Sequence, residues 1–353
     1  MSEQNAKQMT FSVHPYLQRR WKHVGRKLAF SARDRASWKA WQRRTRKKLR
    51  QLTGYDTMQK APPKPRITDQ IVFEQYVRQR VEIQSERGVV VPMYVLIPRE
   101  VKPPYNAVIA AHGHASGGKL GVCGCREHSS VSDTIDQHNY DYGVQFVKAG
   151  FIAFCPDARG FGERQEQLAR DNILNASCQW INNMAIPLGQ TVTGMWTWDI
   201  HRIVDYVQSR PDCRPDKIGC AGLSGGGLQT LWASALDERI RCAIVSGYLY
   251  GYKESLLDQH GNCSCNYVPH LYEHVDMGDI GALIAPRPLL VETGTRDPLN
   301  GASGMKNVLS QMRIIRRAYA LLGARNHLKH DVFDGEHQWH GAEAIPWMKR
   351  FLG

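Results

Sequence analysis

From residue 105 to residue 353, short apolar runs alternate with segments of helical periodicity. Within 303–322, for example, Met305, Val308, Met312 and Ile315 recur every three or four residues and share one helical face. Such alternation predicts a mostly parallel central sheet with helices on both faces. The predicted strands are Ala107–Ala111, Phe151–Cys155, Lys217–Ala221, Cys242–Ser246, Pro288–Val291 and His330–Phe333. The predicted helices are Tyr142–Ala149, Gly194–Val207, Gly225–Leu236, Ser303–Leu322 and Ala342–Phe351.

The segment before residue 105 follows a different pattern. Ala61–Pro65 contains three prolines and predicts a stiff linker. Apolar and polar residues alternate over Gln70–Ile83, and Glu86–Gly88 then leads into the apolar run Val89–Pro98. This pattern predicts an antiparallel pair of strands at one edge of the sheet.

Residues 1–60 predict a helical extension that packs on the body, residues 61–353. From Ser37 onward, apolar or small residues recur at spacings of three and four, which places them on one helical face, and Gly54 provides a stop. Basic residues occupy most of the remaining positions of this helix. The residues of the predicted buried stripe are Trp38, Trp41, Thr45, Leu49 and Leu52.

The formal charge of +13 belongs to this extension. Residues 1–60 hold 16 Lys or Arg and 3 Asp or Glu, whereas the other 293 residues hold 30 of each. We interpret the excess as the solvated basic face of a docked helix. The alternative is a surface for an acidic partner, such as nucleic acid, an anionic polysaccharide or an acidic patch on another subunit. No motif that reads bases is present, so no nucleic-acid partner is expected.

Three long inserts interrupt the alternation, at about 116–141, 162–190 and 247–280, and the first two are expected to be irregular. The first two follow predicted strands at the carboxyl edge of the sheet, where open α/β sheets bind ligands, so the inserts are expected to wall a pocket. Aromatic side chains in them, including Trp180, Tyr248 and Tyr267, could stack on a sugar or aryl group of a substrate. The alternative for each is packing of the insert onto the body.

The chemistry of the chain centres on Gly222–Gly226, a G-x-S-x-G motif between a predicted strand and a predicted helix. This is the nucleophile elbow pattern, in which a sharp turn exposes the serine, here Ser224, above the sheet. Glycines on either side of the serine let the strand and helix approach closely. By itself the motif is also compatible with an ordinary glycine-rich turn.

A base and an acid follow Ser224 in the required chain order. Asp297 comes just after a predicted strand, where the acid of this fold lies, and is preferred to Glu292 within the strand. His337 follows the last strand in a loop with Gly335 and is preferred to His340 as the base. The alternative role of Asp297 is a turn cap before Pro298.

Two backbone N–H groups are predicted to form an oxyanion hole. One belongs to Gly225, directly after the serine, and the other to His114 in the loop after the predicted strand Ala107–Ala111. His112 and His114 could instead be metal ligands, although no carboxylate accompanies them in sequence.

Nine cysteines include two C-x-C pairs, Cys123 with Cys125 and Cys263 with Cys265. Together the pairs could form a four-thiolate zinc site, but C-x-C is a tight spacing for chelation. We favour free buried or pocket-lining thiols, and we expect neither a metal nor another cofactor.

Four stretches resemble the dienelactone-hydrolase-like branch of the α/β-hydrolases, and within it the acetyl-xylan-esterase-like proteins. The stretches are His112–His114, Asp157–Arg164, Gly222–Gly227 and Leu283–Leu290. The resemblance covers about residues 70–353 and implies an α/β-hydrolase fold and a serine carboxylesterase with Ser224, Asp297 and His337 as its triad. Asp157–Gly160 stands where the best-known xylan deacetylases carry R-G-Q-G. We interpret it as a strand-end turn held by an ion pair of Asp157 and Arg159, and the alternative is that these two residues line the pocket wall.

These observations predict a metal-independent serine ester hydrolase that acts on a small-molecule ester, such as an acetyl ester of a carbohydrate. The alternatives are a peptidase of the prolyl-oligopeptidase type and a non-catalytic binding protein that uses the basic helix. No apolar run reaches the roughly 18 residues of a membrane span, and the polar start lacks a secretory signal. We therefore expect a cytoplasmic protein without a membrane partner, either a monomer or a homo-oligomer.

Overall fold

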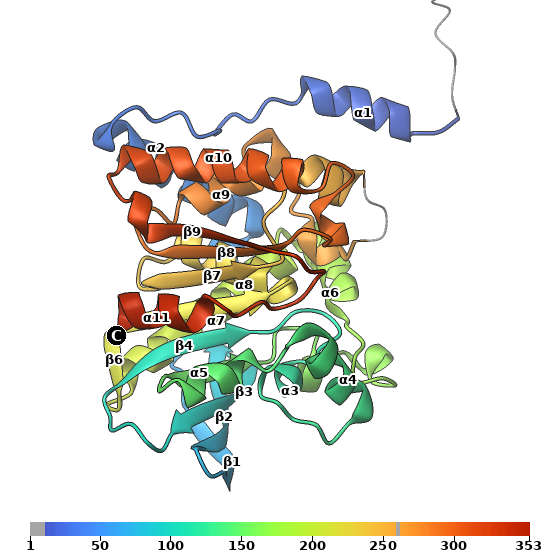
Figure 1. Ribbon diagram of the computed structural model, residues 1–353. Helices are drawn as coiled ribbons and strands as arrows, with labels where there is room; N and C mark the ends of the chain where they lie inside the picture. Colours follow the sequence, from blue (N-terminus) through green and yellow to red (C-terminus); the bar gives the residue numbers. More distant parts are fainter. Residues whose placement is uncertain (1–10, 259–261) are drawn as a thin grey trace, which may run out of the picture.

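A single sheet organises the molecule (Figure 1). The computed structural model describes residues 11–258 and 262–353. In these residues nine strands are ordered β1-β2-β3-β5-β4-β6-β7-β8-β9. The neighbours from β5 to β9 are parallel, whereas β1, β2 and β3 join the edge in antiparallel fashion. The strands are β1 Arg66–Val72, β2 Tyr76–Glu86, β3 Val89–Pro98, β4 Tyr105–Ala111, β5 Ile152–Pro156, β6 Cys213–Leu223, β7 Cys242–Ser246, β8 Leu289–Gly294 and β9 Leu328–Phe333.

Helices cover both faces of the sheet. Residues of α5 and α11 pack with Val108, Ala221 and Ile244 on one face. Residues of α7 and α8 pack on the other, where α9 and α10 extend the layer toward β8. The helices are α1 His14–His23, α2 Arg35–Thr53, α3 Lys119–Val122, α4 Ser129–His138, α5 Tyr142–Lys148, α6 Cys178–Ala185, α7 Val192–Ser209, α8 Gly225–Leu236, α9 Met277–Ala282, α10 Met305–Leu321 and α11 Ala344–Leu352.

The predicted parallel core is confirmed, with strand and helix bounds shifted by a few residues. Two expectations need correction. The alternating stretch Gln70–Ile83 spans two strands, because the chain turns at 73–75 between β1 and β2. The first two inserts are not wholly irregular, since α3, α4 and α6 lie within them. Residues 259–261 of the third insert lie outside the described residues.

The helix α2 begins at a capping box and ends at a glycine with a positive φ. The Asp34 side chain accepts the Ser37 N–H in a capping box, and Gly54 adopts φ 69° at the C-terminal end. Trp38, Trp41, Thr45 and Leu49 are buried, as the stripe predicts, whereas Leu52 is half-buried. The helix thereby packs against α7 and α8.

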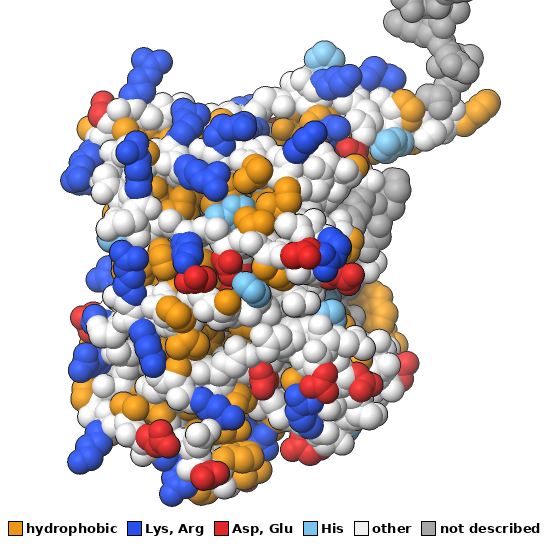
Figure 2. Space-filling model, viewed as in Figure 1, with side chains coloured by type: hydrophobic (Ala, Val, Ile, Leu, Met, Phe, Trp, Pro, Cys, Tyr) orange, Lys and Arg blue, Asp and Glu red, His pale blue; other side chains and the backbone are white. Residues whose placement is uncertain are grey.

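Basic side chains gather on the face where α1, α2 and α10 lie (Figures 1 and 2). The guanidinium of Arg317 on α10 stacks over Phe30, and Arg35 donates to the Leu322 carbonyl. Although residues 61–353 are neutral overall, α10 therefore adds to the basic face of the N-terminal extension. In the described part of the chain, no helix combines the length and the apolar character that a bilayer crossing requires.

Candidate active site

Ser224 lies at a strained turn between β6 and α8. Its backbone has φ 60° and ψ −119°, a conformation that L-residues rarely adopt. The Ser224 N–H donates to the Ser246 carbonyl at the end of β7 (2.9 Å), which fixes the turn on the neighbouring strand. Ser224 is half-buried, so its hydroxyl lies at the carboxyl edge of the sheet without being enclosed by the core.

The glycines at both ends of the motif are required by close backbone contacts. A Cβ on Gly226 would lie 2.0 Å from the Ala111 carbonyl oxygen, and one on Gly222 would lie 2.5 Å from the same oxygen. These atoms belong to backbone and cannot move aside as a flexible side chain would. The reason given above for glycine at these positions is therefore confirmed: β4, β6 and α8 meet too closely for a side chain.

His337 and Asp297 form a hydrogen-bonded pair. The Nδ1 atom of His337 lies 2.7 Å from Oδ2 of Asp297, and the other carboxylate oxygen accepts the Leu299 N–H at 2.8 Å. Asp297 thus serves both as the turn cap and as the partner of the imidazole. Its side chain is 2% exposed and that of His337 is 23% exposed, so the ring, and not the acid, faces the solvent side.

The His337 ring lies against the backbone that holds the elbow. A Cβ on Gly247 would be 3.0 Å from Cε1 of His337 and 3.1 Å from Leu223. Gly247 directly follows Ser246, whose carbonyl accepts the Ser224 N–H. The imidazole and the turn of the nucleophile motif therefore meet at the ends of β6 and β7.

The two competing residues lie in other contacts. The Nδ1 atom of His340 is 2.7 Å from Oδ2 of Asp331, and its ring stacks on Phe333. Glu292 is buried in β8 and accepts the Gly341 N–H at 3.0 Å. Burial raises the pKa of Glu292 to about 7.

The loop after β4 reaches the start of α8. A Cβ on Gly113 would lie 2.9 Å from the Gly225 nitrogen, and one on Gly225 would lie 3.1 Å from Nδ1 of His114. As the first residue of α8, Gly225 has an N–H without an intrahelical acceptor. The two residues predicted to supply the oxyanion hole therefore lie side by side.

His112 has a structural role that excludes the pairing of His112 with His114 on one metal. Its Nε2 accepts the Ala158 N–H at 3.0 Å, so the ring proton lies on Nδ1, which donates to the Gly113 carbonyl at 2.9 Å. Burial lowers the pKa of His112, which favours this neutral form. Both ring nitrogens are thus engaged by backbone.

Two tyrosines that the sequence analysis did not single out brace the same loop. The Gly113 N–H donates to the Tyr140 hydroxyl at 2.7 Å, and the Tyr142 hydroxyl donates to the Ala111 carbonyl at 2.5 Å. Both rings are buried. Tyr140 lies at the end of the first insert and Tyr142 is the first residue of α5, so their position is their sequence signal.

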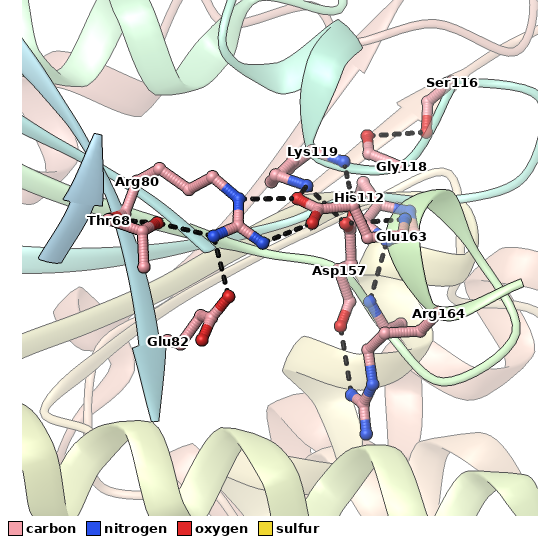
Figure 3. A network of polar contacts seen from close by, with 11 residues as sticks. Thr68, Arg80, Glu82, His112, Ser116, Gly118, Lys119, Asp157, Glu163 and Arg164 are labelled. Atoms are coloured by element: carbon pink, nitrogen blue, oxygen red, sulfur yellow. Dashed lines mark hydrogen bonds and ion pairs between the residues drawn. The ribbon is translucent and has the colours of Figure 1, made fainter. Parts of the chain in front are cut away.

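A buried ion pair anchors the end of the loop (Figure 3). Lys119 Nζ lies 2.5 Å from Oδ2 of Asp157 and 2.6 Å from Oε1 of Glu163, and Glu163 also pairs with Arg80 on β2. Arg80 and Lys119, with burial opposing them, lower the pKa of Glu163 to about 2.

The structure corrects the expected turn at Asp157 and Arg159. The two residues do not pair with each other, since Asp157 binds Lys119 and the backbone N–H groups of Lys119 and Glu163. Arg159 instead makes two hydrogen bonds to Asp199 (2.9 and 3.0 Å) and pairs with Glu86. The turn is therefore held by two separate sets of ion pairs.

The three aromatic candidates for substrate binding lie in different surroundings. Trp180 on α6 is 43% exposed. Tyr248 is buried and its hydroxyl donates to Oδ1 of Asn266 at 2.9 Å. Tyr267 donates to the Leu256 carbonyl and lines a cavity of about 330 Å³ between α1 and residues 252–258 and 267–273. Ser224, Asp297 and His337 are absent from the described lining of that cavity. Of the three aromatic candidates, Trp180 is the one with an exposed ring.

The two C-x-C pairs lie apart, which excludes the four-thiolate site. Cys125 accepts a hydrogen bond from Arg78 and, with Cys123, packs in the core beneath α5. Cys263 and Cys265 instead lie beside Cys178 and His114. All nine cysteines are free thiols, and hydrogen bonds from Cys178 and Cys265 lower the pKa of Cys263. Within the described residues, this second cluster is the one group of three or more His, Cys, Asp or Glu side chains arranged to hold a metal ion.

Comparisons with known proteins agree with this architecture. The chain is similar to a Bacillus subtilis protein named "Putative hydrolase YtaP", with 30% identity over 246 residues. The match covers 66% of this chain and 73% of the other. Its fold is similar to that of a "putative acetyl xylan esterase" from Bacteroides fragilis, with a TM-score of 0.80 and 18% identity over 97% of this chain and 95% of the other. A glucuronoyl esterase from Solibacter usitatus gives a TM-score of 0.67 and 14% identity over 94% and 98% of the two chains. A profile of the Abhydrolase family matches residues 3–346. The chain has an α/β-hydrolase fold and belongs to the Abhydrolase family.

Proposed function

We propose that the protein is a serine carboxylesterase in which Ser224, His337 and Asp297 form the catalytic triad. The observation that carries the proposal is the His337–Asp297 hydrogen bond of 2.7 Å beside the strained turn at Ser224. The order of the three residues along the chain and their places after β6, β8 and β9 support it further.

In the proposed reaction His337 accepts the Ser224 proton as the oxygen attacks the ester carbonyl. Asp297 accepts the Nδ1–H of His337, which leaves Nε2 free to act as the base and stabilises the imidazolium. The imidazolium then donates its proton to the leaving alcohol. Water attacks the acyl-enzyme by the same route, releases the acid and restores Ser224.

The Gly225 and His114 N–H groups are the proposed donors to the oxyanion. Gly225 stands at the positive end of α8, and the contact between Gly113 and the Gly225 nitrogen brings the second donor loop beside it. The tyrosines and the Lys119–Asp157 pair hold this loop before substrate binds. Donors fixed in advance stabilise the developing charge without reorganising in the transition state.

The proposed substrate is a small acyl ester of a carbohydrate, acetyl before longer chains. The support is similarity alone: structures with the same fold are named acetyl xylan esterase and glucuronoyl esterase. The exposed Trp180 could stack on a sugar ring.

Hydrolysis of p-nitrophenyl esters from acetyl to octanoyl tests the reaction, with acetylated xylan oligomers and a methyl glucuronate as sugar substrates. We expect the wild type to prefer acetyl esters and Ser224→Ala to lose on the order of 10⁴-fold or more in kcat. An aminoacyl-p-nitroanilide tests the peptidase alternative and should not be cleaved. Wild-type activity in Ser224→Ala would overturn the triad.

A further inference from the structure

Four soft metal ligands converge next to the proposed oxyanion hole. Cys178 Sγ lies 3.2 Å from Cys263 Sγ and 3.4 Å from Nε2 of His114. Cys265 Sγ lies 3.6 Å from the same nitrogen. The four ligand atoms all lie within 4.8 Å of one another. The side chains come from the loop after β4, the start of α6 and the segment before Tyr267, which are separated by many residues along the chain.

We propose that Cys178, Cys263, Cys265 and His114 bind one zinc ion. In a tetrahedral zinc site the Zn–S bonds are about 2.3 Å and the Zn–N bond about 2.0–2.1 Å, so neighbouring ligand atoms lie about 3.5–3.8 Å apart. The observed separations fall around this range. Small side-chain rotations are enough to place all four atoms on one ion.

The ligand types favour zinc over a harder cation. Three thiolates and one imidazole are soft or borderline donors, and no carboxylate belongs to the cluster. Calcium and magnesium prefer oxygen ligands. Four protein ligands leave no open position for water, so the ion is structural and takes no part in the ester chemistry.

The surroundings hold the ligands in place. The Asn266 amide donates to Cys265 Sγ at 3.7 Å, and the Tyr248 hydroxyl holds the carbonyl end of that amide. The Phe161 ring packs edge-on against the His114 ring at 5.0 Å. Hydrogen bonds to ligand atoms and an apolar shell are the outer contacts that orient metal ligands in proteins. They also give the buried Tyr248 a role that does not require contact with substrate.

The position of the site suggests what the ion does. It would tie two pocket-forming inserts to the loop that carries His114, whose Nδ1 lies close to Gly225. This consequence for catalysis rests on the proposed function, whereas zinc binding does not.

Elemental analysis tests the proposal directly. The full chain, purified without a histidine tag under reducing conditions, should contain about one zinc per chain. Cys263→Ser and Cys178→Ser should lose most of it. Cys125→Ser, a change in the other C-x-C pair, is the matched control and should retain it. Ser224→Ala should retain zinc while losing activity, which separates this proposal from the triad.

Cobalt exchange provides a second measurement on the wild type, in case the cysteine variants do not fold. After zinc is removed with a chelator, Co²⁺ should give thiolate charge-transfer absorption and the strong visible bands of a tetrahedral site. Three outcomes would overturn the proposal: no zinc in the wild type even after incubation with excess Zn²⁺, unchanged zinc in folded Cys263→Ser, or a Cys178–Cys263 disulfide in the freshly isolated chain. Another metal at the same stoichiometry would overturn the assignment to zinc.

Discussion

Two histidine–aspartate pairs lie beside the last two strands of the sheet, and the pair that contains His337 adjoins the elbow. His337 and His340 are three residues apart, and each has its Nδ1 atom 2.7 Å from an aspartate oxygen. The ring of His337 lies against Gly247, next to the turn at Ser224. The ring of His340 stacks on Phe333 with centroids 4.4 Å apart. An aspartate partner alone therefore does not identify a general base. The two histidines differ in what else the ring contacts, which is the backbone next to Ser224 for His337 and the Phe333 ring for His340.

The two acids associated with β8 differ in the same way. Asp297 follows the strand and binds His337. Glu292 lies within the strand, bonded to the Gly341 N–H, and its pKa is influenced by Asp331 and His340. Glu292 therefore belongs with the His340 pair, and the comparison is between one site beside the elbow and one formed by β8, β9 and the loop before α11.

The strongest test of this comparison replaces His337. In His337→Ala we expect a loss of kcat on the order of 10⁴-fold or more, because the change removes the proposed general base of the triad. Initial rates on p-nitrophenyl acetate measure it, with circular dichroism to show that the variant folds. A loss below tenfold in a folded variant would mean that His337 is not the base.

Replacement of the two aspartates should affect kcat almost as differently. Asp297→Asn should lower kcat on the order of 10³- to 10⁴-fold, since the amide cannot hold His337 in the tautomer that leaves Nε2 as acceptor. Asp331→Asn is the matched change in the other pair and should lower kcat less than about threefold. Equal losses in the two variants would contradict the division between the pairs.

Glu292 provides a prediction about stability. Its pKa is raised to about 7, so between about pH 4.5 and 7 the native state binds more protons than the unfolded state. The free energy of unfolding contributed by this group therefore falls as pH rises through that window. Glu292→Gln removes this pH dependence. The free energy of unfolding of the variant minus that of the wild type should therefore be about 2 kcal/mol greater at pH 8 than at pH 5.

Urea unfolding of both proteins at the two pH values gives the difference. A stability increment that is the same at pH 5 and pH 8 would show that Glu292 is ionised in the native protein throughout.

The smallest expected effect is that of His340→Ala. Since the ring stacks on Phe333 and binds Asp331, the change should cost about 1 kcal/mol of stability and leave kcat/KM within about threefold of the wild type. Thermal unfolding and esterase assays measure the two quantities. A large loss of kcat/KM with unchanged stability would place His340 in the reaction.

The fold and the elbow were predictable because their signals are local. Short apolar runs that alternate with helical periodicity predict the parallel strands, and the glycines at the two ends of Gly222–Gly226 are required by contacts with β4, the neighbouring strand in the sheet. The His337–Asp297 pair could be predicted because both residues directly follow strands whose order in the sheet is a rule of the fold. That they act on Ser224 stays a prediction.

The contacts within the inserts were not predictable. Cys178 meets His114 across 64 positions and Cys263 across 85, and neither periodicity nor spacing encodes such partners. The two C-x-C spacings allowed one site made of both pairs, an alternative that we did not favour, and in the structure the two pairs lie apart. The ion pair at Asp157 was wrong in its partner for the same reason, because burial patterns specify a face and not the residue across from it.

The series of charges from Lys119 to β1 has a consequence for ionic strength (Figure 3). The inner pair, Lys119 with Asp157, has side chains that are 3% and 0% exposed. At the outer end Arg66, which pairs with Glu82, is 72% exposed. Dissolved ions screen exposed charges far more than buried ones. Raising the salt concentration should therefore weaken the ion pair between β1 and β2 while the anchor of the His114 loop keeps its strength.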